Sequence, residues 1–209
     1  MELVELGGLA QMDTEEAEVI KNLVAAFFGN FDERVQIEGI YFAEERAPFT
    51  VYLFPRDRFL VAICLPRHQA DNPLARLIHL AHELVHCLNP NGLPPYQATV
   101  LEEGLAEHAK VYLGREIYQG EYPDYDFRDL STGKYREAFN IIERVIEFEG
   151  LEEMRMAVRT LRRDLGQPFA RILEESLSAY FPNTPLDLIS SLSENFRSWE
   201  GNEGEQVEI

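Results

Sequence analysis

Cysteine is scarce in this sequence, which holds only Cys64 and Cys87 among its 209 residues. Two cysteines cannot form the disulfide framework that holds small secreted domains together. We therefore expect both to be small buried groups in a protein of the reducing cytoplasm. The N-terminal segment has neither a basic start nor a continuous apolar stretch, so it does not predict a secretory signal.

Positive charge is scarce as well. Lys and Arg number 19 against 37 Asp and Glu, which gives a formal net charge of −18. A surface this acidic repels the phosphates of nucleic acids and anionic lipids, so we expect no nucleic-acid partner and no membrane partner. No apolar run approaches the roughly 18 residues that a membrane-spanning helix needs. The hydrophobic share of 45% is nevertheless enough to form the core of a globular domain.

The order of the predicted elements indicates an α+β fold, because strands come first and helices follow. A capping pair predicts a first helix at 13–28. Runs rich in β-branched and aromatic residues then predict strands at 35–42, 50–54 and 59–65. Their short connections favour a small antiparallel sheet, although a mixed sheet fits the same pattern. The remaining predicted elements are helices at 73–89, 97–113, 135–149, 152–164, 168–181 and 186–196, with a long loop at 120–133.

This order predicts a single domain over 1–199. Its upper lobe, 1–115, would contain the sheet and the two helices that carry the motifs described below. A helical lower lobe, 134–199, would close a cleft against it. The acidic, polar end of the chain, 200–209, is expected to be a disordered tail.

The segment His82–His86 reads His-Glu-Leu-Val-His, with its two histidines four positions apart. On a helix this spacing places both imidazoles on one face, where their nitrogens can reach a single metal ion. Glu83 follows the first histidine and can reach a water molecule at an open position on the metal. The opposite face carries an apolar stripe that can be buried in the core. The stripe contains Leu74, Leu77, Ala81, Leu84 and Leu88.

A second acidic group follows on the next predicted helix, where Glu103 and Glu107 lie one turn apart. On a solvated helix two like charges at this spacing cost about 0.2–0.5 kcal/mol, whereas beside a divalent cation the same pair is favourable. Gly104 lowers helix propensity by about 1 kcal/mol relative to alanine, and the close approach of another helix would explain it. The two groups together favour a metal site over a helical interaction protein with a chance motif.

The combination of His-Glu-Leu-Val-His at 82–86 with Glu-Glu-Gly-Leu-Ala-Glu at 102–107 resembles the gluzincin metallopeptidases. The resemblance covers only 78–112. It implies a zincin-like fold, one Zn²⁺ per chain held by His82, His86 and Glu103, and Glu107 as the residue that orients His82. The spacing to the third ligand is slightly shorter than in the best-known members, and Glu102 stands where they have asparagine. We expect Glu102 to point toward the apolar side of its helix, which leaves Glu103 as the ligand.

The resemblance also implies metal-assisted hydrolysis of a peptide or protein substrate, with Glu83 as general base. Members of this group bind extended peptides along an edge strand, and the strand at 59–65 is the candidate here. They also draw a donor for the oxyanion from downstream residues. The sequence leaves four candidates for this donor: His108, Tyr112, Tyr118 and Tyr122.

Two alternatives stay open at the level of sequence. The chain could be a catalytically weak or inactive zincin-like module that binds metal and serves regulation or protein interaction, although the intact Glu83 argues against this. Separately, His79 lies one turn before His82 and would make the zinc structural if it were a fourth ligand. Zinc itself is inferred from the ligand types, because two histidines and a glutamate also accept other divalent ions.

Overall fold

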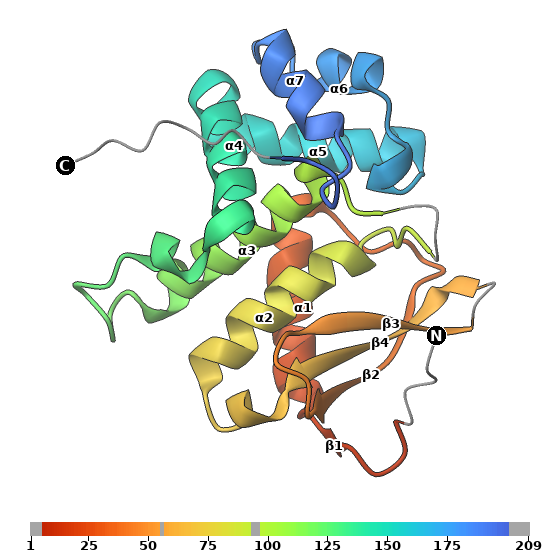
Figure 1. Ribbon diagram of the computed structural model, residues 1–209, viewed down its shortest axis with the longest axis vertical. Coiled ribbons are helices and arrows are strands. Elements are labelled where there is room, and N and C mark those ends of the chain that lie inside the picture. Colours follow the sequence, from red (N-terminus) through yellow and green to blue (C-terminus); the bar gives the residue numbers. More distant parts are fainter. Residues whose placement is uncertain (1–5, 55–56, 93–96, 201–209) are drawn as a thin grey trace.

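The computed structural model describes residues 6–54, 57–92 and 97–200. Its fold is α+β, as the order of the predicted elements indicated (Figure 1). One four-stranded sheet has the strand order β1-β2-β4-β3. The strands are β1 (Ala10–Gln11), β2 (Gln36–Ala43), β3 (Phe49–Phe54) and β4 (Asp57–Pro66).

The sheet is mixed, and the favoured antiparallel arrangement is wrong for one pair of strands. β2 and β4 run parallel, whereas β1 pairs with β2 and β3 pairs with β4 in antiparallel fashion. β4 takes an inner position because its residues 61–65 are all buried without alternation, the pattern of an enclosed strand. The prediction that 59–65 forms an edge strand is therefore wrong, and the edge strand beside it is β3.

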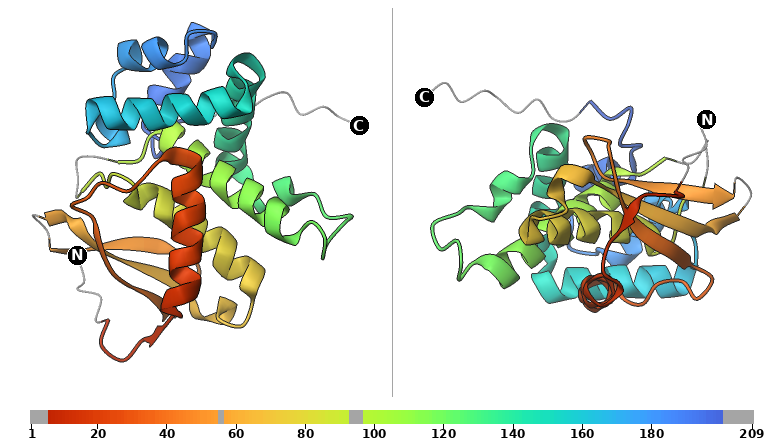
Figure 2. Two further views of the ribbon diagram at one scale, coloured as in Figure 1. Left: turned by 180° about the vertical axis from the view of Figure 1, so that it is seen from behind. Right: turned by 90° about the horizontal axis from the view of Figure 1, so that it is seen from below.

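The first two helices, α1 (Thr14–Phe28) and α2 (Pro73–Cys87), pack against each other and share one hydrophobic cluster with the inner strands. Seen from behind, α1 lies across α2 and α3 (Figure 2). Both helices begin where the sequence predicts, because the side chains of Asp13 and Asn72 accept hydrogen bonds from backbone amides of the first turns.

The later helices gather at the end of the molecule opposite to the sheet (Figure 1). They are α4 (Gly133–Glu149), α5 (Leu151–Leu165), α6 (Glu174–Tyr180) and α7 (Leu186–Ser193). Between them and α2 lies α3 (Val100–Tyr118), which Thr99 caps at its start. The helix predicted at 168–181 is divided into a 3₁₀ turn, Phe169–Arg171, and α6. The predicted loop at 120–133 contains a further 3₁₀ turn, Phe127–Leu130.

The sequence predicted that another helix approaches closely at Gly104. In the structure this helix is α4, which packs against α3 at this position. A Cβ at this position would lie 2.6 Å from Ile142 Cγ1 and 2.7 Å from the carbonyl oxygen of Ala138. Any side chain would therefore push α3 away from α4. Because Glu103 is the neighbouring residue, this contact helps to fix α3 at the height where Glu103 faces α2.

Three further expectations concern the chain as a whole. Cys64 and Cys87 are buried free thiols, as predicted. None of the helices in the described ranges is long and apolar enough to cross a membrane. The predicted disordered tail at 200–209 lies, from residue 201 onward, outside the described residues.

Candidate metal centre

His82, Glu83 and His86 all lie on α2. The two histidines contact carboxylates of α3, whereas Glu83 contacts Thr50 of the edge strand β3. The other side of α2 contributes Leu80 and Leu84 to the core, where both are buried. This division agrees with the amphipathic pattern of the sequence. His82 and Glu83 are nevertheless almost completely shielded from solvent. Polar groups buried in this way require partners of their own.

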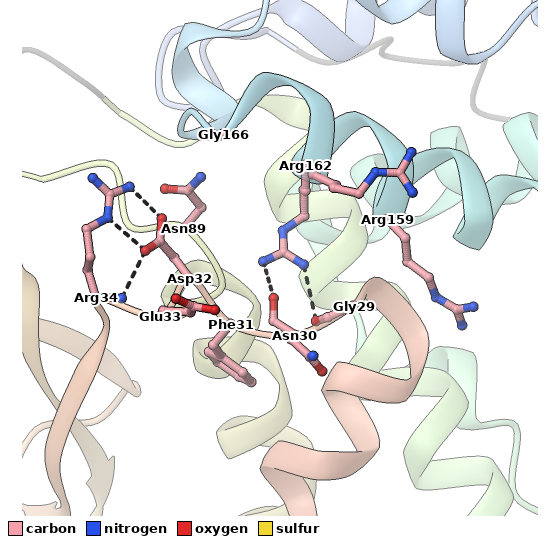
Figure 3. A pocket seen from close by; sticks show the side chains of 11 residues that line it. Gly29, Asn30, Phe31, Asp32, Glu33, Arg34, Asn89, Arg159, Arg162 and Gly166 are labelled. Carbon is pink, nitrogen blue, oxygen red and sulfur yellow. Dashed lines mark hydrogen bonds and ion pairs between the residues drawn. The ribbon is translucent and has the colours of Figure 1, made fainter.

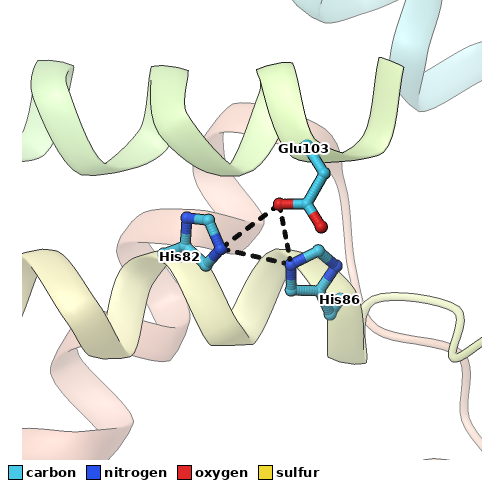
Figure 4. A group of neighbouring side chains, drawn as sticks. All are labelled: His82, His86 and Glu103. Atoms are coloured by element: carbon cyan, nitrogen blue, oxygen red, sulfur yellow. Dashed lines mark hydrogen bonds and ion pairs between the residues drawn. The ribbon is translucent and has the colours of Figure 1, made fainter. Parts of the chain in front are cut away.

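Three predicted ligand atoms converge between α2 and α3 (Figure 4). The Nε2 atoms of His82 and His86 are 3.3 Å apart. Glu103 Oε2 lies 3.5 Å from the first and 3.6 Å from the second. Among the described residues, these three form the group of ligand atoms that could hold one metal ion. The sequence prediction of the set His82, His86 and Glu103 thus names three side chains that the fold brings together.

Each imidazole is also held from behind by a carboxylate. His82 Nδ1 lies 2.8 Å from Glu107 Oε1, the pairing expected for this glutamate. His86 Nδ1 lies 2.8 Å from Glu102 Oε1, a pairing that was not expected. The prediction that Glu102 faces an apolar side of its helix is wrong, because α3 is buried on nearly all sides and Glu102 meets the end of α2. α3 runs antiparallel to α2, so an earlier residue of α3 faces a later residue of α2.

These contacts fit a bound cation. If each Nδ1 carries the proton that it donates to a carboxylate, each Nε2 presents a lone pair toward the centre. Glu103 Oε2 is buried there without a hydrogen-bond donor. Three acceptor atoms then face one another with no proton between them, which is unfavourable unless a positive charge lies among them. Two imidazoles and one carboxylate are ligands that Zn²⁺ accepts while one coordination position stays open.

The pKa shifts show how strongly this place attracts positive charge. Burial alone would lower the pKa of His86, but the charges of Glu103 and Glu102 raise it well above its ordinary value. Burial alone would raise the pKa of Glu107, but His82, Lys110 and Ser131 bring it down to about 2. The raised pKa of His86 favours a proton on this imidazole when no cation lies beside it. Metal binding at this place is therefore expected to displace a proton.

Glu83 lies beside the converging atoms, at the junction of two cavities of about 170 Å³ and about 490 Å³. Its Oε2 accepts a hydrogen bond of 2.8 Å from Thr50 Oγ1 on the edge strand β3. Among the described residues, no group donates a hydrogen bond to the other carboxylate oxygen, and a water or substrate in the cleft can reach this end of the side chain. Both cavities are lined by Pro48, His82, Glu83 and Tyr135.

Tyr135 on α4 is the residue of this cleft that sequence reasoning missed. Its ring centre lies 6.0 Å from that of His82, and its side chain lines both cavities. Burial and the charge of Glu103 raise the pKa of Tyr135, so its hydroxyl stays protonated. No local pattern in the sequence distinguishes it from other tyrosines, because its position results from the packing of α4 beside α3.

The four donors proposed from the sequence do not line these two cavities. His108 is fully buried and stacks on Tyr112 at 4.0 Å between ring centres. Tyr118 and Tyr122 contact each other at the far end of α3. His79 lines the smaller cavity, but its Nδ1 lies 2.6 Å from Gln69 Oε1 and it is outside the group of converging ligand atoms. Burial and the charge of Lys110 lower the pKa of His79 to about 4, so it is neutral at pH 7.

A larger cavity, about 660 Å³, lies away from this centre, between the end of α1 and α5 (Figure 3). Two of its arginines, Arg159 and Arg162, are engaged with the backbone, and the other two, Arg34 and Arg163, pair with Asp32 and Asp164. Arg162 donates hydrogen bonds to the carbonyl groups of Phe28, Gly29 and Asn30, and Arg159 donates to those of Ala26 and Phe27. These guanidinium groups satisfy the free carbonyls at the end of α1, so size alone does not identify a ligand site here.

Comparisons with known proteins add no further assignment. No family model matches the sequence, and no curated protein and no solved structure matches it either.

Proposed function

We propose that the protein is a zinc-dependent peptidase of the zincin type, with His82, His86 and Glu103 as metal ligands. The observation that supports it best is the convergence of three acceptor atoms, two from imidazoles and one from a carboxylate. Each of the two imidazoles is held by a further carboxylate of its own. An arrangement of this kind stabilises a cation and fixes the tautomer of both histidines. When bound, a zinc ion would polarise a carbonyl group and lower the pKa of a water molecule.

Glu83 is the proposed general base. It is the carboxylate of the cleft that neither holds an imidazole nor serves as a proposed metal ligand, and Thr50 fixes one of its oxygens. The other oxygen can accept a proton from the attacking water and return it to the leaving amine. Glu107 and Glu102 remain engaged with His82 and His86 during these transfers, so the two imidazoles keep their orientation.

The proposed substrate is an extended peptide or a protein segment. The cavity of about 490 Å³ beside Glu83 is bordered by β3, whose outer edge has no strand partner among the described residues. Phe49, Thr50 and Tyr52 of β3 line this cavity next to Glu83. A peptide can add to such an edge through backbone hydrogen bonds, which would place a carbonyl group beside Glu83.

Tyr135 is proposed to donate a hydrogen bond to the oxygen of that carbonyl as negative charge develops on it. We expect Tyr135→Phe to lower kcat by about 10²–10³-fold, the effect of losing one such donor, while zinc content is unchanged. Steady-state kinetics together with metal analysis would measure both. Tyr122→Phe is the matched control, because Tyr122 lies outside the cleft and should keep the wild-type rate. Equal rates for the two variants would remove Tyr135 from the reaction.

The proposal is tested most directly by peptide cleavage. The purified protein is incubated with an unbiased peptide mixture, with one equivalent of zinc or with a chelator, and the products are identified by mass spectrometry. Cleavage that stops on chelation and returns with zinc would support a peptidase. Bound zinc without cleavage would instead favour the metal-binding regulatory module.

A further inference from the structure

A line of hydrogen bonds runs from His86 into the C-terminal half of the chain. Glu102 holds His86 Nδ1 through Oε1, and its Oε2 accepts a hydrogen bond of 2.6 Å from Asn91 Nδ2. The other end of the Asn91 amide, Oδ1, accepts a hydrogen bond of 3.3 Å from the backbone N–H of Ala170. Asn91 and Glu102 are both buried, so water does not compete for these contacts.

A second line runs from His82. Glu107 holds His82 Nδ1 through Oε1, and its Oε2 accepts hydrogen bonds from Ser131 Oγ and from Lys110 Nζ. Ser131 is buried and lies just before α4 begins at Gly133. The orientation of this imidazole therefore depends on a residue outside both metal-binding helices.

The C-terminal helices also hold the end of α2 itself. Arg162 on α5 donates a hydrogen bond of 2.9 Å to the carbonyl group of Leu88, two residues after His86. The same guanidinium reaches Asn30 at the end of α1 (Figure 3). The segment that follows His86 is thus fixed by α5, while both imidazoles are fixed through Glu102 and Glu107.

We propose that Asn91 and Ser131 are positioning residues that couple metal binding to the packing of the C-terminal helices. This inference rests on the proposed metal site. Asn91 and Ser131 donate to Oε2 of Glu102 and of Glu107, the outer oxygens. The inner oxygen Oε1 of each of these carboxylates orients an imidazole. If the contact from Asn91 is lost, Glu102 can rotate and His86 no longer points its Nε2 at the centre. If the contact from Ser131 is lost, Glu107 keeps only the contact from Lys110 and holds the orientation of His82 less firmly. The coupling is reciprocal, so metal binding also stabilises the packing of these helices.

Metal retention is the first measurement. We expect Asn91→Ala and Ser131→Ala each to weaken zinc affinity by roughly 10–100-fold, as losses of such outer partners do. Asn183→Ala is the matched control, because Asn183 also donates to a glutamate, Glu149, but at a place without contact to the metal ligands. The affinities are measured by competition with a chromophoric chelator. Wild-type affinity in both Asn91→Ala and Ser131→Ala would overturn the proposal.

Hydrogen exchange tests the coupling itself. In the wild type, zinc should slow amide exchange in the segment that contains the 3₁₀ turn Phe169–Arg171 and α6, although no proposed ligand lies there. In Asn91→Ala at saturating zinc, this slowing should be lost or strongly reduced. A merely structural role for Asn91 would accelerate exchange with and without zinc alike, and that result would overturn the coupling.

Imidazole nitrogen NMR of the metal-free protein separates failure of this inference from failure of the proposed function. Asn91→Ala should change the hydrogen-bond state of His86 Nδ1 and leave His82 as it is, whereas Ser131→Ala should do the reverse. This selective pattern in a protein that binds no zinc would keep both residues as positioning residues and reject the metal function. Binding of zinc without the selective pattern would reject the positioning roles alone.

Discussion

Replacement of Glu83 by glutamine is expected to leave zinc bound and to lower kcat by at least 10²–10⁴-fold, the usual contribution of a general base (about 2.7–5.4 kcal/mol). Glutamine has nearly the same shape and can still accept the hydrogen bond from Thr50 through its amide oxygen. It cannot take a proton from water. The converging atoms of His82, His86 and Glu103 are untouched, so metal content should stay at the wild-type value.

The measurement compares kcat and zinc content for wild type, Glu83→Gln and Glu175→Gln. The last variant makes the same chemical change on the exposed surface of α6 and should behave as wild type. Full activity in Glu83→Gln would reject the proposed mechanism while leaving the metal site intact. Loss of zinc in this variant would show instead that Glu83 is part of the metal site.

The part of the site that depends on a single helix could be predicted from the sequence. The four-residue spacing of His82 and His86 fixes their common face wherever α2 lies, and the same holds for Glu103 and Glu107 on α3. A helix repeat of 3.6 residues decides these relations before any packing is known. For this reason each pair could be named from spacing, whereas the convergence of the two pairs in one site was implied by the motif resemblance.

Glu102 could not be placed by the same rule. The prediction assigned α3 one apolar and one polar side, but residues 100–111 of this helix are all buried. A helix enclosed on all sides has no single solvent face from which the direction of a side chain can be read. The partner of Glu102 is set by the antiparallel crossing of α2 and α3, which is a property of the tertiary fold.

The position of the edge strand, by contrast, had a signal in the sequence. The run from Val61 to Leu65 is uniformly apolar, which is typical of an enclosed strand, whereas β3 contains Thr50 and Tyr52 among its apolar residues. Chain order placed the strand at 59–65 nearest to the motif helix and outweighed this signal. Tyr135 had no such signal, because it reaches the cleft only through the packing of α4.

Loss of zinc from both His86→Ala and Glu103→Ala is the second large effect that we expect. The wild type should bind about one equivalent of zinc, because the described residues contain one group of converging ligand atoms. Either substitution removes one of three ligand atoms, so affinity should fall by more than the 10–100-fold that is typical for the loss of an outer partner. Elemental analysis after dialysis against a weak chelator would measure the metal content.

His79→Ala is the control for these two variants, since His79 lies on the same helix but holds Gln69 and stands outside the converging group. It should keep one equivalent of zinc. If zinc were lost from His79→Ala, His79 would be a fourth ligand and the third histidine of the centre, and a structural metal would become the better explanation. If the wild type held no metal even after zinc was added, the raised pKa of His86 would indicate that a proton alone balances these carboxylates, and the cleft would have to be studied as a binding surface for a cationic partner.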